Sequence, residues 1–252
     1  MSNKKKILGA VFAVLALYLV FVVVAVIVDT KDSRETASSQ NGSERVADRH
    51  SPGEENFKIG MTLFEKGDHE SASRYFLSAA EQGHAEAQYA LGRYYDYDTR
   101  SSKDRQKSIQ WYRKAAEQGH AEAQYNLGFR YLMGEYVNQD PDEALKWIRK
   151  AAEQGLSVAQ FQLGACYQSG IGGKRGIAEA VTWYRKAAEQ DDPAIDAKSV
   201  LVANEAKYKL GECYLNGIGV EQNREEAVKW FTEAAEHGNT EAIDALRRLG
   251  AE

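Results

Sequence analysis

The chain has 252 residues, of which 43% are hydrophobic and 27% are charged, and its formal net charge at pH 7 is −5. This composition excludes a chain that is disordered throughout. The acidic excess after residue 53 argues against binding to a nucleic-acid backbone, which requires a clustered basic face, and two cysteines are too few for a disulfide framework.

An uncharged apolar run occupies residues 7–28, directly after Lys4, Lys5 and Lys6. At about 1.5 Å per residue this run reaches roughly 33 Å as a helix, enough to cross a bilayer core of about 30 Å. A cleaved signal peptide is the alternative, but its apolar run is usually only about 7–15 residues long. We therefore predict a transmembrane helix at 7–28, with residues 1–6 as its cytoplasmic basic flank.

Residues 29–53 are rich in Ser, Asp, Glu and Arg and almost free of branched aliphatic side chains. Such a segment cannot bury a core, so we predict a flexible linker. Its coil dimension is roughly 25–30 Å, which would keep the folded part close to the membrane surface.

A repeating unit begins after the linker. The stretch AAEQGHAEAQYNLG at 115–128 has close copies at 79–92 and 151–164, each 36 residues away. A fixed period of this length is typical of a solenoid, in which each repeat buries its apolar face against its neighbours. We predict an all-α solenoid at 54–252, built from helix-pair repeats at 54–84, 85–120, 121–156, 157–192 and 204–239.

Capping residues mark the starts of several second helices. Asp68 is expected to cap the second helix of the first repeat. In the third repeat Asp140 is the expected cap, Pro141 follows at the first helical position and Glu143 can close a capping box. Asn223 and Glu226 can form the same box in the fifth repeat.

The fourth repeat departs from the pattern, because Asp191-Asp192-Pro193 stands where the other repeats end in Gly, and an insertion at 193–203 follows. Asp192 and Pro193 form a good helix start, so we predict that the first helix of the fifth repeat is extended, from about Pro193 to Leu215. This extension should disturb the stacking of the fourth and fifth repeats. The segment 240–252 is expected to be a capping helix, with Arg247 and Arg248 on its polar outer face.

The repeats resemble the Sel-1-like repeat family, a subclass of the tetratricopeptide-like α-solenoids. The matching pattern is A-x-A-x-Y-x-L-G-x-x-Y, then G-x-G-V, then A-x-x-W-Y-x-x-A-A-x-x-G, over about 85–239, and the first repeat is closer to the parent tetratricopeptide form. The resemblance implies a right-handed superhelix that acts as a protein-binding scaffold, often at membranes and in bacterial envelopes. With the predicted anchor, it implies a single-pass protein of a bacterial inner membrane, with its repeats in the periplasm.

Several chemistry-bearing residues are better explained by structure than by a site. The glycine-rich loop 170–176 lacks the Ser or Thr and the preceding strand of a phosphate-binding loop. His84, His120 and His237 end second helices, where we expect them to bond last-turn carbonyls rather than a metal. Cys166 and Cys213 are expected to be free thiols, because equivalent positions in successive repeats lie too far apart for a disulfide.

Recurring aromatic residues are expected to form the core, because they recur at the same place in every repeat. These are Tyr95, Tyr131, Tyr167, Tyr214, Trp111, Trp147, Trp183 and Trp230. The opposite face of each first helix varies between repeats, and it points to the concave side in the parent fold. Its occupants lie six and three residues before the repeat's glycine and one and four residues after it.

We predict that this variable face forms a groove for a protein or peptide. The candidate residues are Tyr89, Arg93, Tyr125, Phe129, Leu132, Phe161, Gln168, Tyr208, Glu212 and Leu215. Phe129 and Leu132 are the sharpest candidates, because they are apolar on a surface that we expect to be exposed. The alternative is that Tyr125 and Phe161 simply pack against the next repeat.

These observations predict a membrane-anchored interaction scaffold that is not an enzyme and has no cofactor and no metal. The alternative is an envelope enzyme or ligand-binding protein with β-lactam or peptidoglycan-related activity. Relatives in this family that have a cysteine pair in each repeat are associated with β-lactam binding or hydrolysis, but this chain lacks those pairs.

Overall fold

The computed structural model describes residues 53–97, 102–173, 175–190 and 197–250. The predicted flank at 1–6, the transmembrane helix at 7–28 and the linker up to residue 52 lie outside these ranges. Among the helices within them, none has the length and apolarity needed to cross a bilayer.

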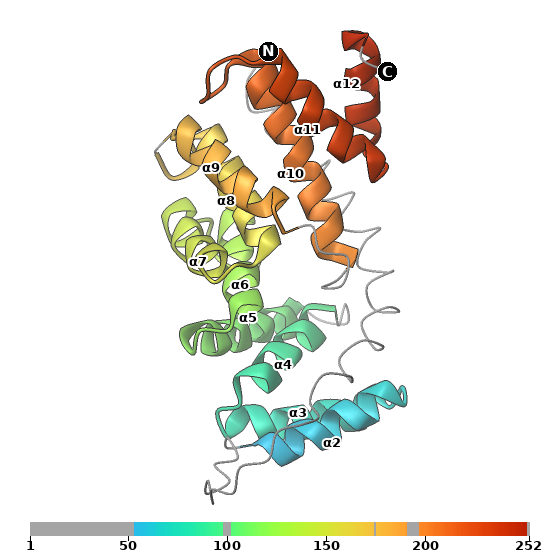
Figure 1. The fold of residues 1–252 in the computed structure, drawn as a ribbon. Helices are drawn as coiled ribbons and strands as arrows, with labels where there is room; N and C mark the ends of the chain where they lie inside the picture. Colours follow the sequence, from blue (N-terminus) through green and yellow to red (C-terminus); the bar gives the residue numbers. More distant parts are fainter. Residues whose placement is uncertain (1–52, 98–101, 174, 191–196, 251–252) are drawn as a thin grey trace, which may run out of the picture.

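The described residues fold into α-helices joined by short turns, which confirms the all-helical solenoid (Figure 1). The helices pair as α2 (Glu54–Glu65) with α3 (His69–Glu81), α4 (Ala85–Tyr97) with α5 (Ser102–Glu117), α6 (Ala121–Met133) with α7 (Pro141–Glu153), α8 (Ser157–Ser169) with α9 (Ile177–Ala188), and α10 (Ala197–Asn216) with α11 (Arg224–Glu236). A 3-10 turn, η1 (Ile171–Gly173), links α8 to α9, and α12 (Thr240–Leu249) follows α11.

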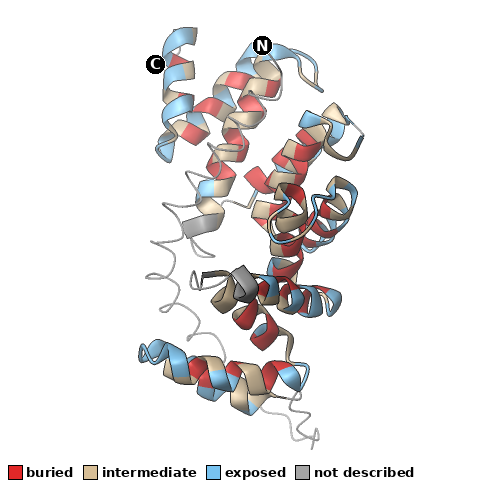
Figure 2. Ribbon diagram, turned by 180° about the vertical axis from the view of Figure 1, so that it is seen from behind, coloured by how far each residue is buried: buried red, intermediate tan, exposed pale blue. Residues whose placement is uncertain are grey.

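The pairs stack in chain order, from α2 and α3 at one end to α11 and α12 at the other (Figure 1). First helices of neighbouring repeats also contact one another, α4 with α6 and α8 with α10. This contact places the first helices on the inner, shorter side of the stack. Buried residues lie where neighbouring helices meet (Figure 2).

One glycine on each first helix packs against a large side chain of its partner helix. The five pairs are Gly60–Phe76, Gly92–Tyr112, Gly128–Ile148, Gly164–Tyr184 and Gly211–Phe231. A Cβ atom added at any of these glycines would lie only 2.4–2.8 Å from the partner side chain. The glycine therefore sets how closely the two helices of a repeat approach.

Small residues allow the same close approach between repeats. Ala115 and Ala116 at the end of α5, and Ala151 and Ala152 at the end of α7, expose at most 1% of their surface. The glycine that follows each pair, such as Gly119 with φ of 96°, adopts a left-handed conformation that ends the helix.

Buried glutamines connect one repeat to the next. The side-chain amide of Gln124 donates to the carbonyl of Ala116 in the preceding repeat at 3.0 Å, and its oxygen accepts from Gln154 at 2.7 Å. Gln88 and Gln160 make the same pair of bonds in their repeats. These buried amides are therefore satisfied across each junction, as buried polar groups must be.

The predicted N-caps Asp68, Asp140 and Asn223 all accept hydrogen bonds from the first turn of their helices. The predicted capping boxes are wrong. The backbone N–H groups of Asp140 and Asn223 donate to the carbonyls of Tyr131 and Tyr214, so they are not available to the side chains of Glu143 and Glu226.

The predicted extension of the fifth repeat's first helix is present. Helix α10 has 20 residues, whereas α4, α6 and α8 have 13 each. The predicted start at Pro193 lies outside the described residues. The extension does not separate the fourth and fifth repeats, because α10 packs against both α9 and α8, with the hydroxyls of Ser199 and Ser157 3.3 Å apart.

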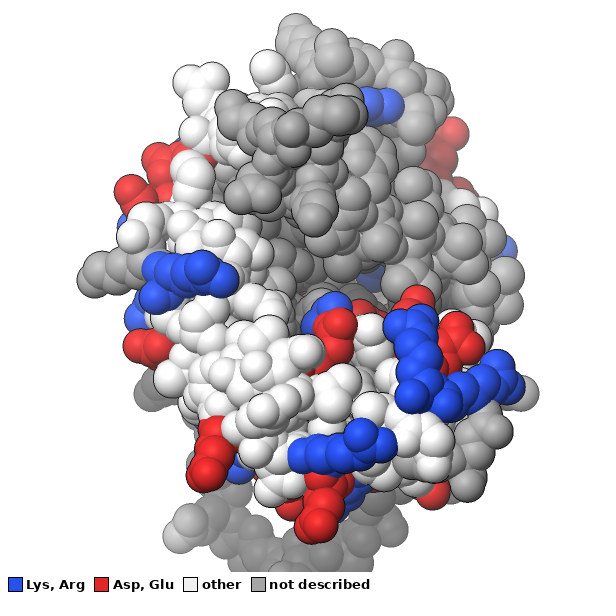
Figure 3. Space-filling model, turned by 90° about the horizontal axis from the view of Figure 1, so that it is seen from above, with Lys and Arg blue, Asp and Glu red and all other residues white. Residues whose placement is uncertain are grey.

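Helix α12 closes the C-terminal end of the stack. It buries Ala242 and Leu246, and Arg247 and Arg248 are exposed, as predicted. Counted from the N-cap Asn239, Arg247 takes the place that Gly128 takes after the N-cap His120. Figure 3 looks onto this end, where basic and acidic side chains are interspersed.

Replacement of Gly128 by Ala should destabilise the protein by about 1–2 kcal/mol. The new Cβ would lie 2.8 Å from Ile148 Cγ1 and 2.9 Å from the backbone oxygen of Ala144, and such overpacking outweighs the better helix propensity of Ala. Urea unfolding measures the change. Asn126→Ala on the same helix is the control, and equal stability of the two variants would contradict the packing role of Gly128.

Candidate functional site

The structure divides the predicted groove residues into two classes. Tyr125, Leu132 and Phe161 are buried, with 5%, 8% and 8% of their surface exposed. The others are partly exposed: Tyr89, Arg93, Phe129, Gln168, Tyr208, Glu212 and Leu215. The predicted exposure of Leu132 is wrong, because it belongs to a cluster with Tyr125, Ile148 and Leu163 at the junction of α6, α7 and α8.

The first repeat adds three apolar side chains to this inner face. Phe57, Met61 and Phe64 stand at the same distances from Gly60 as Tyr89, Arg93 and Asp96 do from Gly92. Met61 is 37% exposed and Phe64 is 40% exposed, which makes them the most open apolar side chains on the inner face. The spacing rule that defines the inner face in the four repeats with the fuller sequence pattern also selects these residues in the first repeat.

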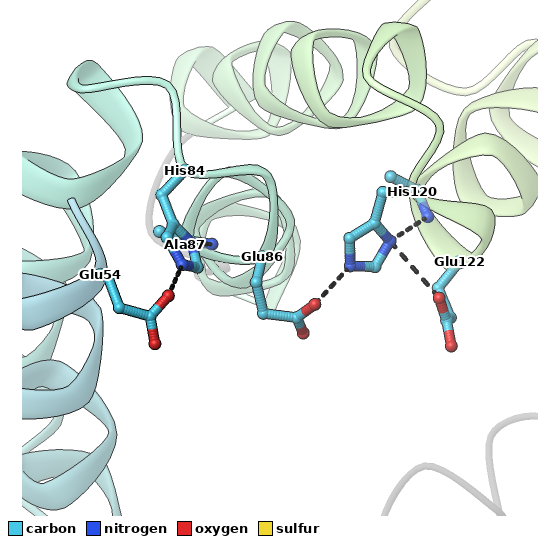
Figure 4. Close-up of polar contacts among 7 residues, drawn as sticks. Glu54, His84, Glu86, Ala87, His120 and Glu122 are labelled. Carbon is cyan, nitrogen blue, oxygen red and sulfur yellow. Dashed lines mark hydrogen bonds and ion pairs between the residues drawn. The ribbon is translucent and has the colours of Figure 1, made fainter. Parts of the chain in front are cut away.

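A row of histidines and glutamates joins the first three repeats along this face (Figure 4). His84 Nε2 lies 3.1 Å from a carboxylate oxygen of Glu54, and His120 Nε2 lies 2.8 Å from a carboxylate oxygen of Glu86. Each imidazole also stacks on an aromatic ring of the preceding first helix. The ring centroids are 4.6 Å apart for Phe57 and His84 and 4.5 Å apart for Tyr89 and His120.

The same two histidines cap the helices that follow them. His84 Nδ1 accepts from the backbone N–H of Ala87 at 3.2 Å, and His120 Nδ1 accepts from Ala123 at 3.3 Å. The predicted bond to last-turn carbonyls is therefore wrong for His84 and His120, because the left-handed glycine before each turns the side chain towards the next helix. It is confirmed for His237, whose Nδ1 lies 2.9 Å from the carbonyl oxygen of Glu233.

These contacts define the tautomer. Since Nδ1 accepts a backbone N–H, the neutral imidazole has its proton on Nε2 and donates it to the glutamate. The hydrogen bond from His120 holds the pKa of Glu86 below its usual value. The hydrogen bond from His120 therefore stabilises the carboxylate form of Glu86.

Replacement of Glu86 by Gln should lower stability by about 0.5 kcal/mol at neutral pH, since one charge-assisted hydrogen bond at a half-exposed site is lost. Because the pKa of Glu86 is lower in the folded protein than the usual 4.5, its contribution is present above that pH and disappears as the pH falls through the lowered value. The difference between wild type and variant should therefore vanish in acid.

Urea unfolding of both proteins from pH 7 down to pH 3 measures this difference. Glu117→Gln, which removes one charge from the end of α5, is the control. A difference for Glu86→Gln that stays constant over the whole range would show that its carboxylate is not stabilised by His120.

Partly buried ionic groups adjoin the inner face further along the stack. Arg130 on α6 forms ion pairs with Asp96 on α4 and with Glu135. Burial raises the pKa of Asp96, although Arg130 opposes the rise. Burial also raises the pKa of Glu205, and burial together with the nearby charge of Glu212 raises the pKa of Tyr208 to about 12. Asp96 and Arg130 join α4 to α6, and Glu205 on α10 accepts a hydrogen bond from Asn239, the N-cap of α12.

The cysteines are free, as predicted, and both are buried. Burial raises the pKa of Cys166 and of Cys213 to about 11, so at neutral pH both are thiols and poor nucleophiles. Within the described ranges no three His, Cys, Asp or Glu side chains gather closely enough to hold a metal ion. In the glycine-rich loop, Gly170, Gly172 and Gly173 have φ values of 74–76°, which shape the turn.

Most of the recurring Tyr and Trp residues border the core but do not fill it. Of the eight predicted core aromatics, only Trp147 is buried, with 6% exposed. The hydroxyls of Tyr131, Tyr167 and Tyr214 accept from an arginine of the preceding second helix, namely Arg113, Arg149 and Arg185. The core position belongs to the side chain that faces the glycine, and therefore to Tyr112, Ile148, Tyr184 and Phe231.

The geometry defines a class of protein: an α-solenoid of five helix-pair repeats with a variable inner face. The Sel1 repeat model matches residues 60–84, 85–120, 121–156, 157–192 and 204–239. The chain therefore belongs to the Sel1 repeat family, whose members are generally protein-interaction scaffolds and typically not enzymes.

Solved structures show the same fold. A Sel1 repeat protein from Oxalobacter formigenes is 35% identical, with a TM-score of 0.65 over 74% of this chain and 72% of that one. A protective antigen of uropathogenic Escherichia coli with the same repeat fold is 31% identical, with a TM-score of 0.54. The match covers 76% of this chain and 47% of the antigen. No curated protein sequence matches the chain.

Proposed function

We propose that this chain is a membrane-anchored scaffold that binds a protein or peptide through the inner face of its solenoid. The observation that supports this proposal most directly is the exposure of Met61 and Phe64, together with the partly exposed Phe129, on first helices that face inwards. Large apolar side chains left open in this way are typical of interaction surfaces. Family membership supports the same role, because Sel1 repeats generally mediate contacts between proteins.

One position of the inner face suits a binding role because packing constrains it little. The position after the repeat's glycine holds Met61, Arg93, Phe129, Ala165 and Glu212 in successive repeats. The position that faces each glycine holds only Phe, Tyr or Ile. Side chains can therefore change at this position without loss of the fold, and a partner can select among them.

Replacement of both Met61 and Phe129 by Ala should weaken partner capture on the inner face, with a loss of about thirtyfold in affinity if each truncation costs on the order of 1 kcal/mol. Crosslinking of the full chain in native membranes, followed by identification of the captured protein, measures this loss. Tyr75→Ala on α3 is the control, because Tyr75 is exposed to the same degree, 38%, on a second helix. Unchanged capture by the double variant would refute binding by this face.

The proposed membrane anchor at 7–28 places the repeats in the periplasm of a bacterial cell, since the lysines before it favour a cytoplasmic N-terminus. Protease should then spare the repeats in intact cells and digest them in spheroplasts. A cytoplasmic protein serves as the control for lysis. Repeats that survive in intact spheroplasts, but are digested once the membrane is broken, would place them in the cytoplasm.

A further inference from the structure

The inner face of the first three repeats carries a row of carboxylates beside its apolar row. Glu54, Glu86 and Glu122 occupy the same position, six residues before the repeat's glycine. Their side chains are 30%, 52% and 48% exposed. Figure 4 shows all three pointing to the same side of the stack.

The carboxylates of this row outnumber the histidines that contact them. His84 lies beside Glu54, and His120 contacts both Glu86 and Glu122. Two cations lie near the row. Lys58 lies 3.3 Å from one oxygen of Glu54, and Arg93 lies over the ring of Tyr89 on α4.

An apolar row runs parallel to the carboxylates. Phe57 and Tyr89 stand three residues after Glu54 and Glu86, which puts each aromatic ring on the neighbouring turn of the same helix face. Met61 and Phe64 on α2 and Phe129 on α6 add apolar surface on the other side of those rings, whereas α4 has Arg93 at the position of Met61 and Phe129. A partner on this face would meet negative charge along one edge and apolar side chains along the other.

Both rows are bounded at the fourth repeat. Val158 replaces the glutamate there. At the same place the extension of α10 packs on α8, with Ser199 next to Ser157. The surface therefore spans α2, α4 and α6, and the extension of α10 forms its end.

The spacing of the carboxylates fits one kind of occupant. Successive first helices pack at roughly 10 Å, a distance that about seven residues of an α-helix cover at 1.5 Å per residue. Seven residues are two helical turns, so basic side chains at this interval lie on one face of a helix. A helix of about 15 residues could present three basic side chains to the three glutamates.

We propose that the inner face of repeats one to three binds a basic amphipathic helix. Its Lys or Arg side chains pair with Glu54, Glu86 and Glu122, and its apolar side chains pack on Met61, Phe64 and Phe129. This proposal rests on the proposed function and gives its partner a chemical class.

Binding of synthetic peptides to the full chain in a nonionic detergent tests the proposal, with detergent alone as the blank. One fluorescent peptide of about 15 residues has Leu on one face and Lys at seven-residue intervals on the adjacent face. A second peptide has Glu in place of each Lys. The basic peptide should bind at least about tenfold more tightly, and its affinity should fall as salt is added.

Two matched variants test whether the inner-face glutamates select a basic peptide. Replacement of Glu54, Glu86 and Glu122 together by Gln should lower the affinity for the basic peptide about tenfold or more. Replacement of Glu117, Glu153 and Glu189 by Gln removes the same charge at the ends of second helices and should leave the affinity unchanged. Equal binding of the two peptides, or equal losses in the two variants, would overturn the proposal.

A third variant separates this inference from the proposed function. If Ala at Met61 and Phe129 weakens peptide binding while Gln at the three glutamates does not, the groove binds without selecting charge, and only the basic partner is refuted. If neither change weakens binding, both the basic partner and the groove are refuted. Circular dichroism of each variant confirms that the helices are retained.

Discussion

The contact between a first-helix glycine and a large side chain of its partner helix is the interaction on which the rest of this structure depends. Because a Cβ atom at Gly92 would lie 2.5 Å from Tyr112, no other residue lets the two helices come so close. The contact is made in all five repeats. The core around this contact is rich in alanine and also buries one leucine of each later first helix, namely Leu91, Leu127, Leu163 and Leu210.

Contacts between repeats are more polar than the contacts within a repeat, because buried glutamine amides and histidine N-caps join the repeats as well as apolar surfaces.

The fifth repeat departs from this arrangement. Lys207 stands where Gln88, Gln124 and Gln160 stand in the earlier repeats; it is equally buried, and its ammonium group lies 3.8 Å from Glu233. The change coincides with the insertion, so the fourth junction combines a longer helix with a buried charge in place of a neutral amide.

Features set by local chemistry could be predicted from the sequence. The caps Asp68 and Asp140 depend only on the first turn of their own helices, and the insertion at 193–203 predicts the longer α10. Features that depend on neighbouring repeats were harder. The burial of Leu132 arises from α7 and α8, and His84 turns towards the next helix only because of the backbone before it. The spacing rule finds Met61 and Phe64, yet their exposure depends on how α2 sits at the end of the stack.

The two ends of the repeat stack differ, and Arg247 marks the C-terminal end. At the N-terminal end, Ile59 occupies the position of the buried Leu91 but stays 38% exposed, so that end retains an apolar surface. At the other end, an arginine occupies the position where a further helix pair would need a glycine. Duplication of an internal repeat would therefore lengthen the protein without changing either end. A new second helix added after α12 would lack the first-helix glycine against which it could pack. Repeats can therefore be added within the array, but not directly after α12.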